Sequence, residues 1–130
     1  MIDLSGIKPD AIFCSNDGIA SGVIQALEEY GWAGSIPVTG LDAELLACKR
    51  VAKGTQAVTI FKSIKEQAFV AAEMAVQVAN GKTPEKINTK IFNGSKEVLS
   101  FLIEPVAIDK INLNEVIIKG QVYTASAVYE

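Results

Sequence analysis

An α/β fold, with a parallel sheet flanked by helices in three layers, is the fold class that this sequence predicts. Three short apolar runs that resemble buried strands alternate with three segments of helical periodicity between Pro9 and Gly81. The connections between them are short, and glycines end the helical segments. Strands that alternate with helices in this way form parallel sheets covered by helices.

The first strand is expected at 10–15, because this short apolar run follows Pro9. Asn16 or Asp17 can cap the helix that follows. That helix ends at Gly31, and its apolar positions fall on one face: Ile19, Val23, Ala26, Leu27 and Tyr30.

The same pattern follows twice more. A second strand is expected at 36–41, after which Asp42 can cap a helix that ends at Gly54. The run 57–61 is rich in β-branched residues and predicts a third strand. A long helix is expected over 63–80, with alanine, valine and isoleucine on one side and charged residues on the other.

The remainder of the chain has a weaker pattern. Residues 93–94, Asn-Gly, are a turn signal. The segments 98–103 and 106–108 are β-like, and 112–119 is long enough for one or two helical turns. Residues 121–130 are expected to form a strand or a loose tail.

Composition excludes several classes of function. The 130 residues are 49% hydrophobic with a net charge of −3, which predicts a packed core and offers no basic surface for nucleic acid. The chain has no histidine, so His-assisted nucleophiles and His-containing zinc sites are excluded. No apolar run is long enough to span a membrane, and residues 1–6 lack the features of an export signal. Cys14 and Cys48 are expected to be buried small hydrophobes, with a disulfide as the alternative.

Polar residues follow each of the three predicted strands. Asn16 and Asp17 follow the first, Asp42 the second and Lys62 the third. Ligands of open α/β sheets bind outside the carboxyl ends of the strands, so an amide, a carboxylate and an ammonium are expected to converge there. Such a set can serve several hydroxyl groups at once, as on a sugar. The alternatives are local: Asn16, Asp17 and Asp42 as helix caps, and Lys62 paired with Glu66.

Catalysis has less support in the sequence. Asp42 and Lys62 could form an acid–base pair, or Lys62 a Schiff base, but no neighbouring residue specifies either role. The sequence contains no phosphate-binding glycine loop and no EF-hand spacing. We therefore expect a protein that is not an enzyme and that uses no cofactor or metal.

Specific strings resemble a known family. The run 9–22 resembles a segment shared by type I periplasmic sugar-binding proteins and the inducer domains of LacI-type repressors. The string 40–44, Gly-Leu-Asp-Ala-Glu, is similar to transport-associated binders rather than repressors. The run 49–62 resembles the D-xylose-binding branch, whose strand ends in an aromatic-Lys pair, and 93–120 resembles that branch too.

The resemblance implies a substrate-binding component of ABC-type sugar uptake or sensing, for a monosaccharide such as D-xylose, located in the periplasm or another extracytoplasmic compartment. It implies that Asn16, Asp42 and Lys62 contact the sugar, the same residues that the strand ends indicate. Two positions depart from the branch: Leu41, where glutamine is usual, and Ser63, where proline is frequent.

The resemblance also implies a domain organisation. Such proteins have two lobes with the sugar between them, and they are longer than this chain, which would be one incomplete domain, 1–130, from their C-terminal part. Residues 63–81 would then belong to the other lobe. An ABC permease or a sensor kinase would be the partner of the whole protein. The apolar face of the helix at 63–80 predicts a homo-oligomer or a domain swap. The alternative functions are an interaction or sensor-docking module that dimerises without binding sugar, and the inducer-binding domain of a LacI-type repressor.

Overall fold

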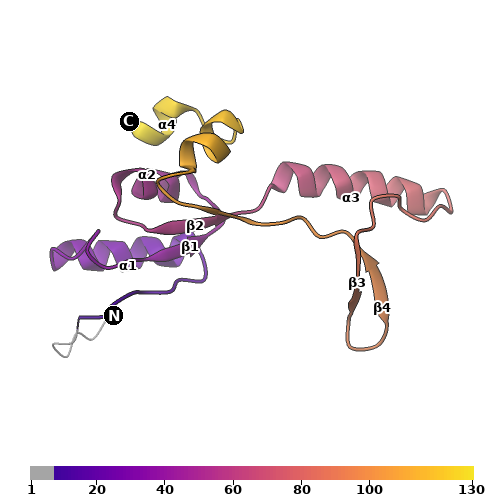
Figure 1. Cartoon of the computed structure of the whole chain (residues 1–130), viewed down its shortest axis with the longest axis horizontal. Coiled ribbons are helices and arrows are strands. Elements are labelled where there is room, and N and C mark those ends of the chain that lie inside the picture. Colours follow the sequence, from indigo (N-terminus) through magenta and orange to yellow (C-terminus); the bar gives the residue numbers. More distant parts are fainter. Residues whose placement is uncertain (1–7) are drawn as a thin grey trace. The chain divides into compact units, whose positions relative to one another are not determined.

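The computed structural model describes residues 8–130, which form two compact units. Among the described residues, the first unit comprises 8–61 and Val106–Glu130, and the second comprises Lys62–Pro105. Figure 1 labels most of the helices and strands of both units, and each unit is described by itself. The absence of an export signal that the sequence predicts for residues 1–6 concerns residues outside those described.

A mixed sheet lies in the first unit. Its strands are β1 (Thr39–Leu41), β2 (Val58–Phe61) and β5 (Val106–Ile108), in the order β1-β2-β5. β1 and β2 are parallel, as predicted, but β2 and β5 are antiparallel. The parallel pair is the one that the sequence predicts, and β5, for which the sequence indicates no direction, adds an antiparallel edge. Phe61, the last residue of β2, pairs with Val106, the first of β5, so the returning chain must run back along β2.

The predicted strand at 10–15 is reduced to a single bridge. Ile12 pairs in parallel with Val38, just ahead of β1. The bridge is closed by two backbone hydrogen bonds, from Ile12 N to Pro37 O at 2.9 Å and from Thr39 N to Ile12 O at 3.0 Å. The segment 10–15 therefore lies beside β1, where the sequence predicts a strand, but it forms no regular ladder.

Two helices connect these strands. α1 (Asp17–Glu29) is capped by Asn16, whose side chain accepts a hydrogen bond from the Ile19 amide at 2.8 Å. α2 (Leu45–Lys53) ends at Gly54, in the left-handed conformation that favours glycine. Its N-cap is Glu44, which makes no side-chain capping bond, so the expectation that Asp42 caps this helix is wrong. The turn after β1 delays the start of α2 to Leu45.

The pairing register shows that α1 and α2 cover the same face of the sheet. Partners in a ladder share a face and alternate residues share a face, so Ile12, Val38, Thr59 and Ile108 all point to one side. Ile12 and Val38 pack with α1, whereas Ile108 packs with α2. Phe13, on the other face, is 86% exposed. α1 and α2 therefore form one covering layer on the sheet, which agrees with the incomplete α/β domain that the sequence predicts.

The C-terminal segment completes the core beneath α2. A π-helical turn spans η1 (Asn114–Lys119), within the region where one or two helical turns are expected. α4 (Ala125–Tyr129) follows, so the prediction of a strand or loose tail at 121–130 is wrong. Thr124 caps α4 by accepting a hydrogen bond from the Ala127 amide at 3.2 Å, which allows so short a helix to form.

The two cysteines lie in different hydrophobic clusters of the first unit. Cys14 packs with α1 and Cys48 packs with α2, and both thiols are free and buried. This confirms the expectation that they are small core residues. Burial raises the pKa of the Cys14 thiol and, more strongly, raises that of Cys48 to about 11.

The second unit consists of a long helix and a hairpin. α3 (Ile64–Ala79) lies within the predicted range. Its N-cap is Ser63, whose hydroxyl accepts a hydrogen bond from the Glu66 amide. The hairpin pairs β3 (Thr89–Phe92) with β4 (Glu97–Ser100) across the predicted turn at 93–94. β3 has no counterpart in the prediction from sequence.

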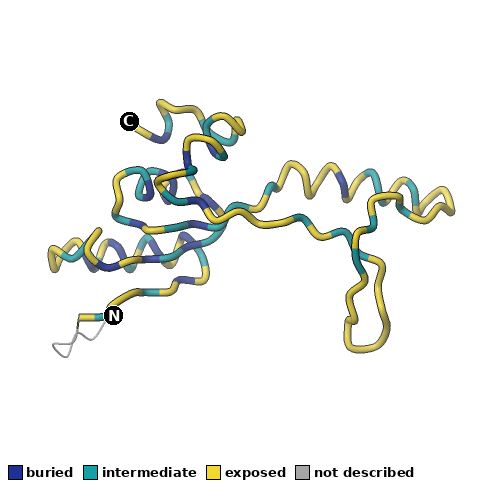
Figure 2. Tube along the Cα trace, in the orientation of Figure 1, coloured by how far each residue is buried: buried dark blue, intermediate teal, exposed yellow. Residues whose placement is uncertain are grey.

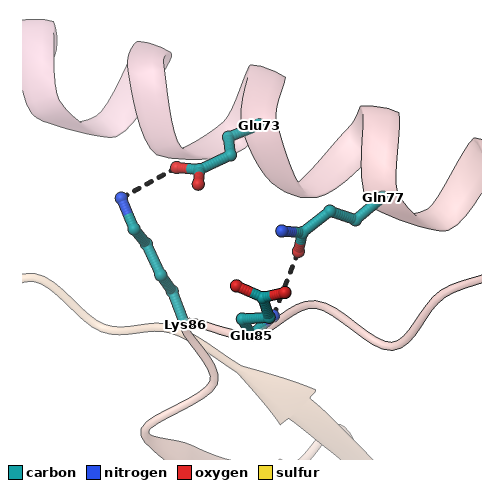
Figure 3. A network of polar contacts seen from close by, with 4 residues as sticks. All are labelled: Glu73, Gln77, Glu85 and Lys86. Carbon is teal, nitrogen blue, oxygen red and sulfur yellow. Dashed lines mark hydrogen bonds and ion pairs between the residues drawn. The ribbon is translucent and has the colours of Figure 1, made fainter.

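Polar contacts tie the segment after α3 to the helix (Figure 3). Lys86 Nζ lies 2.8 Å from Glu73 Oε2, and the Glu85 amide donates a hydrogen bond to Gln77 Oε1 at 3.0 Å. The Lys86 ammonium also lies 5.6 Å from the ring centroid of Phe69. These contacts hold the connection to the hairpin along the helix.

Most of α3 is exposed in the second unit (Figure 2). Val70 is its one buried residue, and Phe69 and Val76 are 68% and 62% exposed. In the described part of the chain, no helix combines the length and apolar character that crossing a bilayer requires.

Candidate functional site

Two of the predicted sugar contacts lie at one edge of the sheet of the first unit. Counting four residues onward from the parallel Ile12–Val38 bridge reaches Asn16 on one segment and Asp42 on the other. Both residues therefore follow the carboxyl ends of neighbouring parallel segments, where ligands of α/β sheets bind. The Cys14 amide donates a hydrogen bond to Thr39 Oγ1 at 3.1 Å, which ties the two segments together beside this edge.

Asn16 can combine its capping role with ligand binding. Its Oδ1 accepts the Ile19 amide at 2.8 Å, and its extended backbone, with φ −157° and ψ 171°, is the usual conformation of a cap. The side-chain amide group Nδ2 is a donor, which suits a hydroxyl oxygen of a sugar. The two readings of Asn16 are thus compatible, since they use different atoms of one side chain.

Asp42 is exposed and stands on a strained turn. Its φ is 102°, and that of Ala43 is 51°, so two successive residues other than glycine adopt the left-handed region. Such conformations cost on the order of 1–3 kcal/mol each and persist only where the surroundings impose them. The turn after β1 is therefore held by contacts from elsewhere in the unit.

Three successive backbone amides of this turn donate hydrogen bonds to residues outside the turn. The Asp42 amide donates to Ile60 O at 2.8 Å, and the Ala43 amide donates to Thr59 Oγ1 at 3.1 Å. The Glu44 amide donates to Asp17 Oδ2 at 3.0 Å. Each partner comes from β2 or from the first residue of α1, so tertiary contacts fix the turn.

Asp17 is the centre of a buried polar cluster that we call the Asp17 cluster, made of Asp17, Arg50, Gln56 and Thr59. The carboxylate is fully buried and accepts hydrogen bonds from Gln56 Nε2 and Thr59 Oγ1, both at 2.8 Å, besides the Glu44 amide. Arg50 Nε donates to Gln56 Oε1 at 2.9 Å, and Arg50 Nη2 donates to the Asp17 carbonyl at 3.3 Å. Hydrogen bonds to a charged partner contribute about 1.5–3 kcal/mol each, which offsets the desolvation of the carboxylate.

Gly40 makes room for this cluster. A Cβ at Gly40 would collide with Asp17 Oδ1 and Gln56 Nε2 and would lie 3.2 Å from Asp17 Cγ. The carboxylate therefore lies directly against the backbone of β1, in the space where a side chain would be. This close approach explains why a strand of the sheet carries glycine here.

The negative charge of Asp17 also affects the thiols nearby. After burial, it is the next cause that raises the pKa of both Cys14 and Cys48, whereas Arg50 acts in the opposite direction on Cys48. Both thiols are consequently neutral at physiological pH, and they serve as packing groups.

Lys62 directly follows β2 and is exposed. It is the first residue of the second unit, and its role as a sugar contact stays a prediction. Within residues 8–130, no group of three or more histidine, cysteine, aspartate or glutamate side chains is placed to hold a metal ion.

Sequence reasoning missed the roles of Gln56 and Thr59 and assigned Asp17 only to a helix cap or a strand end. An Asn-Asp pair before a helix is typical of capping, so the local pattern conceals an inward-facing carboxylate. Two signals could have found it: a glycine within a short strand, at 40, and a threonine within an apolar strand, at 59.

Comparisons with known proteins identify the family of this chain. The family model described as "Periplasmic binding protein domain" matches residues 4–83, more than half of the chain. The chain belongs to the periplasmic binding protein family. The D-xylose-binding periplasmic protein of Haemophilus influenzae is 41% identical over 92% of the chain, and that of Escherichia coli is 44% identical over 86%. Both relatives are named for binding D-xylose in the periplasm.

Solved structures of this family show the same fold. A solute-binding protein of an ABC transporter from Clostridium phytofermentans, with bound β-D-glucose, is 32% identical and has a TM-score of 0.78. The carbohydrate transporter solute-binding protein of Chloroflexus aurantiacus, in complex with D-glucose, is 27% identical with the same TM-score. They match 95% and 90% of this chain, which in turn covers 39% and 34% of theirs. The chain spans 36% and 34% of the two D-xylose-binding relatives.

Proposed function

We propose that this chain supplies one side of a monosaccharide site, with D-xylose as the sugar, in the substrate-binding component of an ABC-type uptake or sensing system. The observation that supports the proposal is that Asn16 and the exposed Asp42 follow the carboxyl ends of neighbouring parallel segments, where ligands of α/β sheets bind. Lys62 is the third proposed contact. The choice of D-xylose rests on the two relatives at 41% and 44% identity, because other relatives are named for multiple sugars.

The partners and the compartment follow from the same proposal. An ABC permease or a sensor kinase would receive the sugar-loaded protein in the periplasm or another extracytoplasmic compartment. Because the chain spans about a third of its curated relatives, we expect these 130 residues alone to bind sugar weakly or not at all. The remaining contacts would come from the part of a two-lobe protein that this chain does not match.

The test uses a hybrid in which this chain replaces the matching segment of the E. coli relative, to which it is 44% identical. Calorimetry with D-xylose, D-glucose and D-ribose should show the tightest binding for D-xylose. A folded hybrid that binds another sugar and gives no heat with D-xylose would contradict the assignment of the sugar. A folded hybrid that binds no sugar would contradict the proposed function itself.

Variants of the hybrid separate the sugar contacts from local structure. Asn16→Asp keeps the oxygen that caps α1 but removes the Nδ2 donor, so affinity should fall at least tenfold while the melting temperature stays close to that of the parent. Asn16→Ala should lose both affinity and about 1 kcal/mol of stability. Asp42→Asn should weaken binding about ten- to a hundredfold, since hydrogen bonds to a charged partner are worth about 1.5–3 kcal/mol.

Lys62 has a matched control in the exposed Lys65 of α3. Lys62→Met should reduce affinity for D-xylose at least tenfold, whereas Lys65→Met should leave it unchanged. Equal effects of the two changes would remove Lys62 from the site and leave it as a surface lysine that pairs with its own helix.

We propose self-association as a second candidate behaviour of these residues. The observation that favours it is the exposure of Phe69, Val76 and Val78 on α3, at 60–68%. Light scattering on the 130-residue chain should then show a dimer. A monomer that binds no dye for exposed hydrophobic surface would exclude it.

A further inference from the structure

The buried Asp17 cluster lies directly beneath the turn that carries Asp42. We propose that Asp17 and Thr59 are positioning residues, which hold the Asp42 turn in the geometry in which its carboxylate meets the sugar. The proposal deepens the proposed function and rests on it, because Asp42 is taken as a sugar contact. It adds residues that do not touch the ligand themselves.

The hydrogen bonds of the turn carry the proposal. Thr59 Oγ1 accepts the Ala43 amide at 3.1 Å and donates to Asp17 Oδ2 at 2.8 Å, and the same Oδ2 accepts the Glu44 amide at 3.0 Å. The hydroxyl and the carboxylate oxygen therefore bind two successive amides and also each other. Because Asp42 and Ala43 both have positive φ, the turn needs such anchors to persist.

A role in stability alone does not explain this arrangement. Buried ionic groups are often replaced by apolar residues of similar volume at no loss of stability, so a buried carboxylate is not needed to fill a core. A carboxylate is needed where several N–H and O–H donors must be received at fixed positions. Three donors converge on Asp17, and one of them is the amide two residues beyond Asp42.

Thr59 offers the cleanest test, because its two substitutions differ in the hydroxyl. Thr59→Val keeps the shape and removes the hydroxyl, whereas Thr59→Ser keeps the hydroxyl and removes a methyl group. In the 130-residue chain, backbone couplings measured by NMR should show that φ of Asp42 and Ala43 leaves the positive range in Thr59→Val and keeps it in Thr59→Ser. In the hybrid, Thr59→Val should weaken D-xylose binding about tenfold, and Thr59→Ser less than twofold.

Asp17 has a compensating pair of its own. Asp17→Asn places an amide group among hydrogen-bond donors, so the turn should lose its positive φ values and the affinity for sugar should fall. Adding Gln56→Glu gives that amide an acceptor and leaves Arg50 with a partner at position 56. The remaining oxygen of residue 17 can then still receive Thr59 and the Glu44 amide. Partial recovery of the positive φ values and of sugar affinity in the double variant is the expected result, since Gln56 Nε2 also donates to Val58 O at 3.2 Å and a glutamate oxygen cannot.

The outcomes are separable. Unchanged φ values in Thr59→Val would overturn the proposal, as would a changed turn with unchanged affinity in a hybrid that still depends on Asp42. If Thr59→Val does not fold, Asp17→Asn with and without Gln56→Glu provides the same comparison. If the unaltered hybrid binds no sugar, the proposed function fails, and the couplings alone decide whether Asp17 and Thr59 hold the turn.

Discussion

Replacement of Gly40 by alanine should be among the most damaging single changes in the first unit. A Cβ at this position would collide with Asp17 Oδ1 and Gln56 Nε2, which are joined by a buried hydrogen bond of 2.8 Å. The carboxylate must then move, and its bonds to Thr59 and the Glu44 amide move with it. The damage therefore reaches the whole Asp17 cluster.

The magnitude follows from three contributions. Overpacking in a well-packed core costs about 1–3 kcal/mol. Breaking the hydrogen bonds of a buried charge costs about 3–5 kcal/mol when it leaves the charge uncompensated. The restriction of the unfolded chain by alanine returns about 0.4–1 kcal/mol. Because relaxation reduces the first two costs, we expect a net loss of about 3–5 kcal/mol, a large fraction of the stability of an ordinary domain.

Gly22→Ala is the matched control. Gly22 lies within α1, is exposed and has no heavy atom within 4 Å of the added Cβ. The same chemical change should therefore stabilise the unit there, by about 0.5–1 kcal/mol, because alanine favours a helix interior. Equilibrium urea unfolding followed by the fluorescence of Trp32 measures both variants. This is the one tryptophan of the sequence, and it packs against the hydrophobic cluster of the first unit that contains the buried residues of α1. A Gly40→Ala variant within 1 kcal/mol of the parent would refute the placement of Asp17 against β1.

Two further predictions concern neighbours of the cluster. Arg50→Lys should lower the free energy of unfolding, measured in urea, by about 1 kcal/mol, because one ammonium cannot replace both the Nε bond to Gln56 and the Nη2 bond to the Asp17 carbonyl. As a control, Lys53→Arg at the exposed end of α2 should change it by less than about 0.5 kcal/mol. Burial raises the pKa of Cys48 from 9.0 to about 11, so the folded state retains a proton that the unfolded state loses. The resulting stabilisation is fully present below pH 9 and is lost as the pH rises through 11, a change of roughly 3 kcal/mol that a Cys48→Ala variant should not show.

The sequence predicts the alternation of strands and helices because those signals are local. The cap at Asn16, the left-handed glycine at 54 and the periodicity of α3 each depend on a few neighbouring residues, and the structure confirms them. Pairing between distant segments is different. β5 joins β2 across more than forty intervening residues, and no local pattern specifies that it runs antiparallel. α4 has five residues, too few for a periodic signal.

For the candidate site, too, the sequence predicts what depends on neighbouring residues and not what depends on distant ones. The topology rule finds Asn16 and Asp42, because polar residues after parallel strands are visible in one dimension. It does not find the support beneath them. Asp17 is next to Asn16 in the chain, yet its partners lie at 44, 56 and 59, and only folding brings these together. The expected cap at Asp42 is wrong for the same reason, since tertiary hydrogen bonds and not helix propensity set the conformation there.

In the proposed site, the adjacent residues Asn16 and Asp17 have different roles, Asn16 in binding the sugar and Asp17 in the fold. Asn16 lies at the ligand edge and is half-buried, whereas Asp17 lies one residue on, points inward and is fully buried. The proposal therefore predicts that a change at position 16 alters sugar affinity with little loss of stability, whereas a change at position 17 alters both the turn that carries Asp42 and the core. The edge of the sheet is consequently arranged before any sugar arrives. The hydrogen bonds of the folded unit already offset the conformational free energy of the positive φ values at Asp42 and Ala43. In the proposed site, sugar binding therefore does not have to supply it.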